Sequence, residues 1–373
     1  MPTIKPLSLL LRLVKYLFVL ITTLTMASVA FLYLAPTFGA DPSGDSLKKI
    51  KASPNYHSGR FSNLTETRIS TRDPSEPLDL ASWLNPPEDK NPREPLPSKK
   101  FDAATLTPGS FVWLGHSTIL FNTNSLIILT DPVFNRASPI PVFGKPFALQ
   151  HSPSLASLPE IDIVLISHDH YDHLDHVTIT GLAETSTIFL VPLGVGAHLQ
   201  RWGIPHSRIT EFDWYDSHTI HNTEFTMTPA RHFSGRGLTN RDKTLWGSWV
   251  VKSTSLNVFF SGDTGYFEDL KSIGKNHGPF DISFIENGAY HKDWAQIHMM
   301  PEESVQASVD INSKVYFPIH WGKFDLAQHR WKAPVKRATA KARQLNVTVA
   351  TPIIGEVFTL SNLPQQAWWS NSK

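Results

Sequence analysis

Three histidines and two aspartates fall within six consecutive residues of this chain, in the segment HDHYDH at 168–173. The segment follows the apolar run IDIVLI, so it occupies the loop at the end of a predicted strand, where functional side chains are commonly placed. Neutral imidazoles and ionised carboxylates are suitable ligands for zinc. One histidine alone would more often be fixed by hydrogen bonds at the edge of a core. This density of ligand-type side chains predicts a metal site instead.

Three later residues occupy the same kind of position. His232 follows the run TMTPA, Asp263 ends the run VFFSGD, and His320 ends the run VYFPIH. Taken singly, the two histidines would be ordinary buried residues and the aspartate a turn residue. Because each lies at the carboxyl end of an apolar run, one edge of a sheet could bring them together with the segment at 168–173.

The elements that would position these residues begin near Ser110. From there, short apolar runs bounded by Gly, Asn or Asp predict strands joined by tight turns. The predicted strands are 111–115, 118–122, 126–131, 161–168, 187–192, 224–230, 246–251, 257–263, 281–287 and 314–320. Helices are predicted near Leu174, from Pro301, where proline occupies a first-turn position, and over about 326–345. This pattern indicates stacked sheets with outer helices.

The amino terminus carries an uncharged apolar run between Lys15 and Asp41. A helix of about 20 apolar residues spans a bilayer, so residues 1–40 are predicted to be a single-pass membrane anchor. Lys5, Arg12 and Lys15 favour a cytoplasmic amino end, which would place the rest of the chain outside the cytoplasm, in the periplasm. The alternative is a cleaved leader ending near Ala30, although the apolar run continues beyond that site.

Residues 41–108 are polar and rich in proline, which disfavours long helices and central strands. They are predicted to form a linker or wrapping arm ahead of a catalytic domain at 109–365. The formal net charge of +1 gives no sign of the basic face that a nucleic-acid partner requires. The chain has no cysteine, which excludes disulfides, thiolate nucleophiles and cysteine metal sites.

The ordered ligand-type residues resemble the five-motif signature of the metallo-β-lactamase superfamily. The resemblance covers about residues 109–360 and implies an αββα sandwich with a dinuclear metal site. It implies that one metal is bound by His168, His170 and His232. It implies that the other is bound by Asp172, His173 and His320, with Asp263 bridging both.

A closer resemblance is to N-acylphosphatidylethanolamine-hydrolysing phospholipase D and its bacterial relatives. It rests on the motifs WLGHST (113–118), TDPVF (130–134), ISHDHYDHLD (166–175), PARHFSGR, GDTGY, GAY (288–290) and PEESV (301–305) ahead of FPIHWGKF. In that family a histidine shortly before the Pro-Glu-Glu segment is linked to catalysis, and here this is His298. Its alternative is a surface or supporting histidine.

The chemistry expected of such a site is hydrolysis. Two zinc ions can ionise a shared water near neutral pH and offset the charge of a phosphodiester. Asp172 and Asp263 are expected to take part in catalysis together with His298. The expected reaction converts N-acylphosphatidylethanolamine to an N-acylethanolamine and phosphatidic acid. Asp131, Asp169 and Tyr171 are hypothesised to support the ligands or the leaving group, but ordinary loop hydrogen bonds would explain them equally well.

Other functions stay open. The lack of cysteine disfavours antibiotic-hydrolysing relatives with a bridging thiolate, and His170 stands where an oxygen-reducing di-iron relative would carry glutamate. Hydrolases of lactones, thioesters, other esters, ribonucleic acid and other phosphodiesters share the same ligands, although the net charge of +1 does not favour a ribonuclease. A membrane-tethered, non-enzymatic metal scaffold is a further alternative. Trp368 and Trp369 suit either a membrane interface or a hydrophobic cap on the fold, and the cap is the preferred interpretation.

Overall fold

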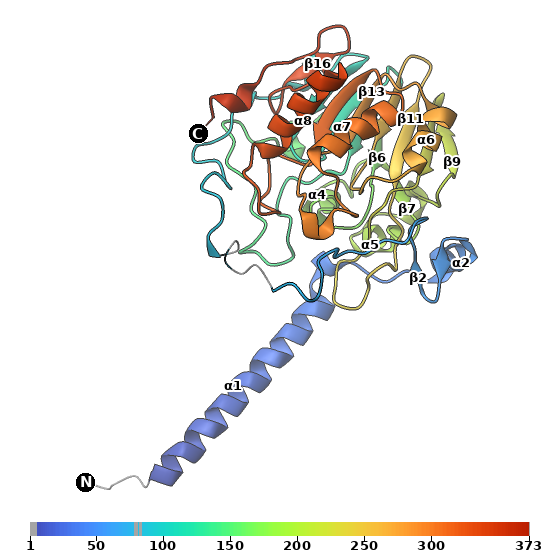
Figure 1. Ribbon diagram of the computed structural model, residues 1–373. Helices are drawn as coiled ribbons and strands as arrows, with labels where there is room; N and C mark the ends of the chain where they lie inside the picture. The colour runs from blue at the N-terminus through green and yellow to red at the C-terminus, as the bar shows by residue number, and fades with distance from the viewer. Residues whose placement is uncertain (1–5, 78–80, 82–83, 373) are drawn as a thin grey trace. The chain divides into compact units, whose positions relative to one another are not determined.

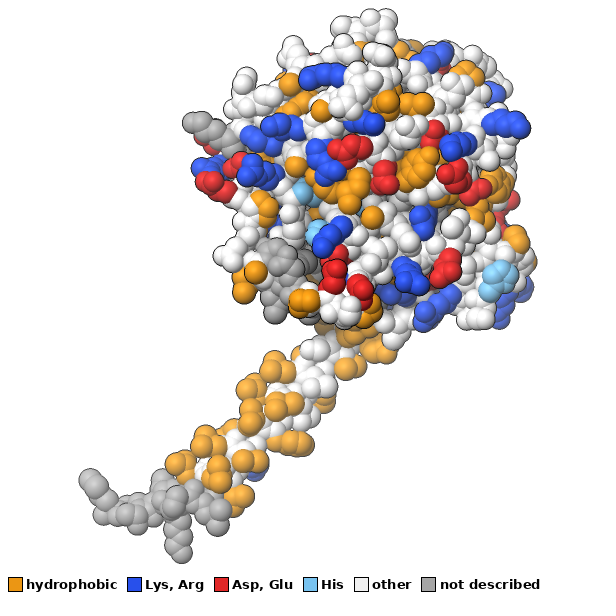
Figure 2. All heavy atoms as spheres, viewed as in Figure 1, with side chains coloured by type: hydrophobic (Ala, Val, Ile, Leu, Met, Phe, Trp, Pro, Cys, Tyr) orange, Lys and Arg blue, Asp and Glu red, His pale blue; other side chains and the backbone are white. Residues whose placement is uncertain are grey.

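The computed structural model describes residues 6–77, 81 and 84–372 (Figure 1). The chain forms two compact units, Met1–Phe38 and Gly39–Lys373. The first contains helix α1 (Pro6–Leu34) and the short helix η1 (Pro36–Phe38). Hydrophobic side chains cover α1 along its length (Figure 2), and its stretch Leu9–Leu34 has a mean hydropathy of 2.2. By length and composition α1 could cross a membrane; a signal sequence would meet the same criteria.

Two mixed sheets form the centre of the second unit. Among the described residues each has seven strands, and the first has the order β16-β3-β4-β5-β6-β7-β8. Its strands are β3 Ser110–Trp113, β4 Ile119–Asn122, β5 Ile127–Thr130, β6 Ile163–Leu165, β7 Ile188–Pro192, β8 Ile209–Phe212 and β16 Val357–Thr359. The second has the order β15-β14-β13-β12-β11-β10-β9. Its strands are β9 Ser217–Ile220, β10 Thr223–Thr228, β11 Ser248–Lys252, β12 Asn257–Phe260, β13 Ile282–Glu286, β14 Val315–Ile319 and β15 Thr348–Val349.

Each sheet is parallel on one side and antiparallel on the other. Strands β5 to β8 run parallel in the first sheet, and β12 to β15 run parallel in the second. The carboxyl ends of the parallel strands in one sheet lie at the same edge, where ligand sites of α/β proteins usually form. The loops after β5, β6, β12, β13 and β14 therefore leave the sandwich where the ligand-type residues occur.

Helices cover both outer faces of the sandwich (Figure 1). They are α4 His176–Gly181, α5 Gly196–Arg201, α6 Asp269–His277, α7 Pro301–Asp310 and α8 Ala333–Leu345. Apolar side chains of both sheets form the central core, among them Phe121 and Phe284. The side of the first sheet that faces away packs against α4 and α5, and the corresponding side of the second packs against α6, α7 and α8. This is the αββα arrangement that the sequence predicted.

The predicted elements were correct in kind but not always in length. All ten predicted strands are present, whereas β8, β9, β15 and β16 of these two sheets and a short hairpin in the arm were not predicted. Helix α7 begins at Pro301 as expected. The helix expected near Leu174 begins at His176, and the one expected over 326–345 begins only at Ala333. Pro334 lies in the first turn of α8, where proline is tolerated because that N–H has no helical acceptor.

The proline-rich arm packs on the sandwich as part of the second unit. It contains the helix α2 (Gly44–Ala52) and a small hairpin of β1 (Tyr56–His57) and β2 (Arg60–Phe61). Its side chains Ile50, Phe61 and Leu96 are buried in the central core. The other short helices are η2 Ala103–Thr105, η3 Leu155–Ser157, η4 His206–Arg208, η5 Lys292–Trp294 and η6 Trp368–Ser370.

The two tryptophans near the carboxyl end are part of the fold. Trp368 and Trp369 are buried, and both rings contact Trp321. Trp368 also stacks on Trp331 and donates its Nε1–H to the carbonyl of Pro352. The preferred interpretation, a hydrophobic cap, is therefore correct.

Candidate metal centre

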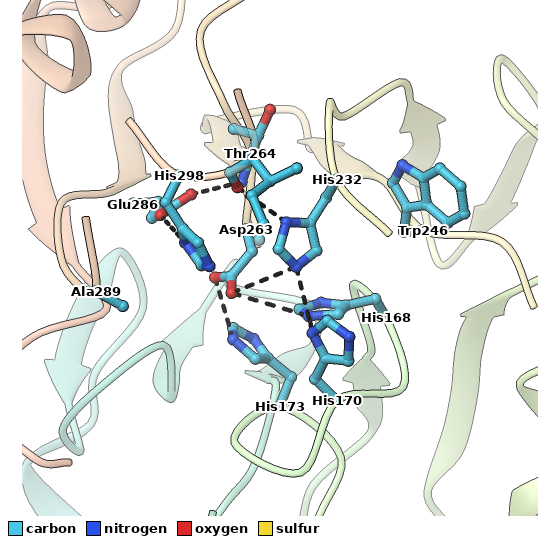
Figure 3. A network of polar contacts seen from close by, with 12 residues as sticks. His168, His170, His173, His232, Trp246, Asp263, Thr264, Glu286, Ala289 and His298 are labelled. Carbon is cyan, nitrogen blue, oxygen red and sulfur yellow. Dashed lines mark hydrogen bonds and ion pairs between the residues drawn. The ribbon is translucent and has the colours of Figure 1, made fainter. Parts of the chain in front are cut away.

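The seven ligand-type residues predicted from the sequence lie together at one edge of the sandwich. They come from the loop after β6, the segment after β10 and the ends of β12 and β14. Figure 3 shows five of them converging: His168, His170, His173, His232 and Asp263. The other two, Asp172 and His320, are 3.1 Å apart between Oδ2 and Nε2. The structure thus brings together all seven predicted residues; their binding of metal stays a prediction.

His168, His170 and His232 form the first cluster. Nε2 of His168 lies 2.9 Å from Nδ1 of His170, and Nε2 of His232 lies 3.3 Å from the same Nδ1. Nitrogens bound to one tetrahedral zinc at about 2.0–2.1 Å are separated by a little over 3 Å. The spacing therefore suits three imidazoles that share one cation.

Asp172, His173 and His320 form the second cluster. Oδ2 of Asp172 lies 3.1 Å from Nε2 of His320 and 3.4 Å from Nε2 of His173. Both carboxylate oxygens of Asp263 face the two clusters: Oδ2 is 3.1 Å from Nε2 of His320, and Oδ1 is 3.1 Å from Nε2 of His173. Oδ2 of Asp263 is also 3.9 Å from Nε2 of His168. Asp263 thus lies where a bridging ligand would have to lie.

A close backbone approach brings Asp263 to this position. Gly262 has a φ of +56°, and a Cβ built on it would lie 2.4 Å from the Cβ of Ser167. Glycine is therefore needed where the end of β12 passes the loop after β6.

Partners on the other ring nitrogens orient the imidazoles. Nδ1 of His232 donates to the carbonyl of Ile297 at 2.9 Å. Nδ1 of His168 lies 2.9 Å from Oγ of Ser167, whose hydroxyl donates to Asp131. Such bonds fix the tautomer and leave Nε2 free to bind a metal.

Asp131 lies where the sequence hypothesis placed it. Its Oδ2 is 2.7 Å from Nδ1 of His173, and its Oδ1 accepts the backbone N–H of Ser167 at 2.7 Å. Burial raises the pKa of Asp131, against the opposing effect of His173 and Ser167. The carboxylate orients His173 without reaching the centre of the site.

The other two hypothesised supporting residues have different roles. Asp169 is buried and bonds to His198, Thr244 and the N–H of Gly235, so it braces the loop that follows His232. The hydroxyl of Tyr171 donates to the carbonyl of Arg236 in the same loop. Both residues stabilise the surroundings of the ligand-type residues.

The electrostatics of the site favour positive charge. Burial alone would lower the pKa of His320, but Asp263 and Asp172 outweigh burial and raise it to about 10. The pKa of His173 is raised for the same reason. Burial and the neighbouring imidazoles lower the pKa of His168 well below its usual value. The carboxylates thus attract cations, while the imidazoles of the first cluster stay neutral and available as ligands.

Unpaired polar atoms support the same conclusion. Among the described residues, the buried atoms that make no hydrogen bond include Nε2 of His173 and Oδ1 of Asp263, which lie 3.1 Å apart in the candidate metal centre. Buried polar atoms are rarely left unpaired in proteins, and a bound ion can satisfy those that lack a hydrogen bond. The residues present therefore fit divalent cations.

His298 also lies at the site. Its ring is 5.1 Å from that of His232 and 5.5 Å from that of His320, between centroids. Its Nδ1 makes a short contact with Oε1 of Glu286, at the end of β13, as Figure 3 shows. Burial lowers the pKa of His298 to about 4. It is therefore neither a surface residue nor isolated from the ligand-type residues.

Two residues of the site, Glu286 and His116, were not predicted from the sequence. Burial and the neighbouring Asp263 raise the pKa of Glu286 well above its usual value. Nε2 of His116 lies 3.0 Å from Oδ2 of Asp172, and its carbonyl accepts the N–H of His320. His116 belongs to the WLGHST motif and Glu286 ends an apolar run, so both positions offered a signal that was not used.

A cavity of about 380 Å³ opens onto the candidate metal centre. Its polar lining consists of Ser70, His170, Asp172, Asp263, Asp293, His298 and His320. Its apolar lining consists of Ile69, Phe233, Ala289, Trp294, Ile297 and Leu326. A ligand with a charged group and an apolar part would find both environments in one cavity.

Comparison with known proteins agrees with the site. A family model described as "Beta-lactamase superfamily domain" matches residues 127–321, which include all seven ligand-type residues. The chain belongs to the metallo-β-lactamase superfamily. It is 42% identical over 346 residues to an uncharacterised protein of Mycobacterium tuberculosis, covering 89% of this chain and 91% of that protein.

Two further proteins bear on the chemistry and the fold. N-acyl-phosphatidylethanolamine-hydrolyzing phospholipase D 1 of Caenorhabditis elegans is 32% identical over 227 residues, covering 57% of this chain and 64% of that protein. The solved structure of Igni18, a metallo hydrolase of Ignicoccus hospitalis, has a TM-score of 0.53 at 19% identity, covering 67% of this chain and 97% of that one. The family and the C. elegans relative support a metal-dependent hydrolase, and Igni18 supports the fold.

Proposed function

We propose that this protein is a zinc-dependent phosphodiester hydrolase that cleaves N-acylphosphatidylethanolamine to phosphatidic acid and an N-acylethanolamine. The observation that carries the proposal is the cavity, in which a cluster of histidines and carboxylates lies beside an apolar wall. A phospholipid has the matching construction, with an anionic phosphodiester next to apolar chains. The named activity of the C. elegans relative supports the same substrate class.

Seven residues would hold two zinc ions in the proposed enzyme: the first cluster, the second cluster and Asp263 between them. The ions, when bound, would ionise water near neutral pH and offset the charge of the phosphodiester. In the overall reaction, water adds to phosphorus, the P–O bond to the ethanolamine oxygen breaks, and that oxygen gains a proton. Asp263 would keep the two halves of the site in register.

His298 would act on the substrate side of the site. Nδ1 of His298 contacts Oε1 of the buried Glu286, so this carboxyl fixes the orientation of the ring and leaves Nε2 for the substrate. With a proton on Nε2, the ring would bond to a phosphoryl oxygen or to the departing ethanolamine oxygen. His298 would thus be a catalytic residue and Glu286 the positioning residue behind it.

The amino-terminal helix supports a lipid substrate. An apolar helix of this length is suited to a bilayer, and a membrane anchor would keep the enzyme at the surface that contains its substrate. We further propose that the second unit lies on the extracytoplasmic side, on the basis of Lys5, Arg12 and Lys15 ahead of the helix.

The decisive experiment uses the full chain in vesicles that contain N-acylphosphatidylethanolamine, in water enriched in ¹⁸O. Attack on phosphorus predicts one ¹⁸O atom in the phosphatidic acid and none in the N-acylethanolamine. Removal of metal with a chelator should abolish turnover, and added zinc should restore it. If the protein hydrolyses carboxylic esters or lactones but not the phosphodiester, the proposed substrate class is wrong. The protein would then be a hydrolase of another substrate class within the same superfamily. If the protein binds metal but turns over none of these substrates, the result would support the alternative of a membrane-tethered, non-enzymatic metal scaffold.

A further inference from the structure

The segment Ser62–Thr71 of the proline-rich arm runs along the candidate metal centre. We infer that this segment contributes directly to the function of the site. Asn63 positions the ligand-type residue His232, and Ile69 shapes the substrate cavity. The first part follows from hydrogen bonds to the backbone of His232. The second rests on the proposed lipid hydrolysis.

Asn63 bonds to both backbone groups of His232. Its Oδ1 accepts the N–H of His232 at 3.0 Å, and its Nδ2 donates to the carbonyl of His232 at 2.8 Å. Strand β10 ends at Thr228, so no strand among the described residues pairs with His232. The amide of Asn63 takes the place of a strand partner and fixes the backbone from which the imidazole projects.

Further contacts hold the amide in one orientation. Oδ1 of Asn63 also accepts from Nε1 of Trp246 at 3.1 Å, in a bond that this N–H shares with the carbonyl of Ala230 at 3.0 Å. Figure 3 shows Trp246 on the far side of His232 from Asp263. Because Oδ1 receives two donors, the amide oxygen and nitrogen cannot exchange places without losing these bonds. The buried ring of Phe61 fixes the chain two residues before Asn63.

The arm also fixes the second support of His232. Nδ1 of His232 bonds to the carbonyl of Ile297, in the loop that leads to His298. Thr71 docks on that loop, with its N–H on the carbonyl of Asp293 and its hydroxyl on the carbonyl of Lys292. The arm therefore supports His232 in two ways: Asn63 fixes its backbone, and Thr71 fixes the loop whose Ile297 carbonyl accepts from its imidazole.

Between these two anchor points the arm reaches the cavity. Ile69 and Ser70 belong to its lining, and Ile69 is half-buried. The N–H of the preceding residue, Arg68, bonds to Oε1 of Gln296 and fixes the approach of this stretch. Ile69 thus contributes to the apolar wall beside the metal centre, although it lies outside the part of the chain that the family model matches.

The test of Asn63 measures metal affinity and needs no substrate. In the full-length protein, N63A and N63D should bind zinc about 10–100-fold more weakly than the wild type, as is typical when a group that orients a ligand is removed. N63D keeps the size and the acceptor, but it places a charged carboxylate oxygen, instead of the amide donor, against the carbonyl of His232. The matched control is N55A: Asn55 lies on the same arm and bonds to Asp213, away from the site. Its zinc affinity should match the wild type.

Zinc affinity is measured by competition with a chromophoric chelator, and folding by circular dichroism. The absorption bands of the cobalt-substituted protein should shift in N63D and stay unchanged in N55A. Wild-type affinity and spectra in folded N63D would overturn the assignment. If N63A fails to fold, the zinc affinity and the cobalt spectra of N63D still test whether Asn63 positions His232.

The test of Ile69 uses N-acylphosphatidylethanolamines with short and long acyl chains. I69W should narrow the cavity and lower kcat/KM about 10-fold or more for the long chain relative to the short one, as expected when a pocket loses room for several methylenes. Its zinc content should stay normal. The control is L64A, because Leu64 is exposed on the same arm and does not line the cavity. An unchanged chain-length preference in I69W would refute the role of Ile69. Absence of any turnover in the wild type would instead refute the proposed function and leave the zinc result on Asn63 intact.

Discussion

The two halves of the candidate metal centre are built differently. In the first cluster, the outer nitrogens of His168 and His232 bond to Ser167 and to the carbonyl of Ile297. In the second cluster, His173 is held by Asp131, but Nδ1 of His320 makes no hydrogen bond within the part of the chain that the structure describes.

The supports differ in kind as well. Asn63 fixes the backbone of His232 in the first cluster. The second cluster depends on Asp172, whose Oδ2 is shared by His116, His173 and His320. The first cluster is therefore positioned by surrounding residues, whereas the second would need the proposed cation to balance its crowded polar groups. We expect the first cation to bind more tightly than the second.

The largest effect should come from Asp263, because it faces both clusters. D263A should weaken the binding of both cations by more than about 100-fold, the upper end of what loss of a supporting group causes. Turnover should fall below detection. Metal content after gel filtration checks this. Retention of two cations by D263A would mean that the clusters do not share this residue.

A sharper test separates the clusters. H320A should lose one cation per chain and keep the other, because the first cluster is intact. H170A should lose the tight cation and leave at most weak binding at the second cluster. Titration of the metal-free protein, followed by calorimetry, distinguishes the two variants. Loss of the same cation in both would contradict the division into halves.

A smaller effect is expected at His116, which holds Asp172 but does not face Asp263. H116N should weaken only the second cation, by about 10-fold. Asparagine is the suitable replacement, because His116 has a φ of +57° and asparagine tolerates this conformation better than alanine. If H116N weakens the binding of both cations equally, His116 supports both clusters and not the second alone.

The smallest expected effect is on the free energy of unfolding, and it comes from Lys323, which lies near the second cluster in the sequence. Lys323 follows His320 by three residues, and its Nζ donates to the carbonyl of Val133 at 2.6 Å. Burial lowers its pKa to about 7, against about 10.4 for an unfolded chain. Between these pH values the unfolded state binds more protons, so the free energy of unfolding should rise with pH.

In K323M this contribution, at most about 1.4 kcal/mol per pH unit, should disappear. Chemical denaturation between pH 7.5 and about 9.5 measures the slope. K314M replaces an exposed lysine and serves as the control. An unchanged slope in K323M would show that Lys323 is not buried as a neutral amine.

The sequence allowed prediction of the fold and of the main side chains of the site, because both leave local patterns. Apolar runs such as that of β14 predict strands, and the residue that ends each run marks the sheet edge. Strands β15 and β16 were missed because runs of two or three residues carry no periodicity. The helix expected from Leu326 starts late because the segment before Ala333 folds into turns.

Long-range contacts were beyond sequence reasoning. Asn63 and His232 are 169 positions apart, and no local pattern connects an arm asparagine with a ligand-type histidine. His116 lies in a motif that was recognised as similar to the family, but its bond to Asp172 depends on a backbone conformation that only the fold shows. Supporting residues are selected by geometry, so they can be named only when the fold is known.

Anomalous diffraction at the zinc edge, from crystals of the zinc-loaded full chain, would locate the proposed cations. We expect two peaks about 3.5–4 Å apart on either side of the Asp263 carboxylate. The peak within the first cluster should have the higher occupancy when zinc is limiting. A single peak, or peaks away from His168, Asp263 and His320, would contradict this expectation.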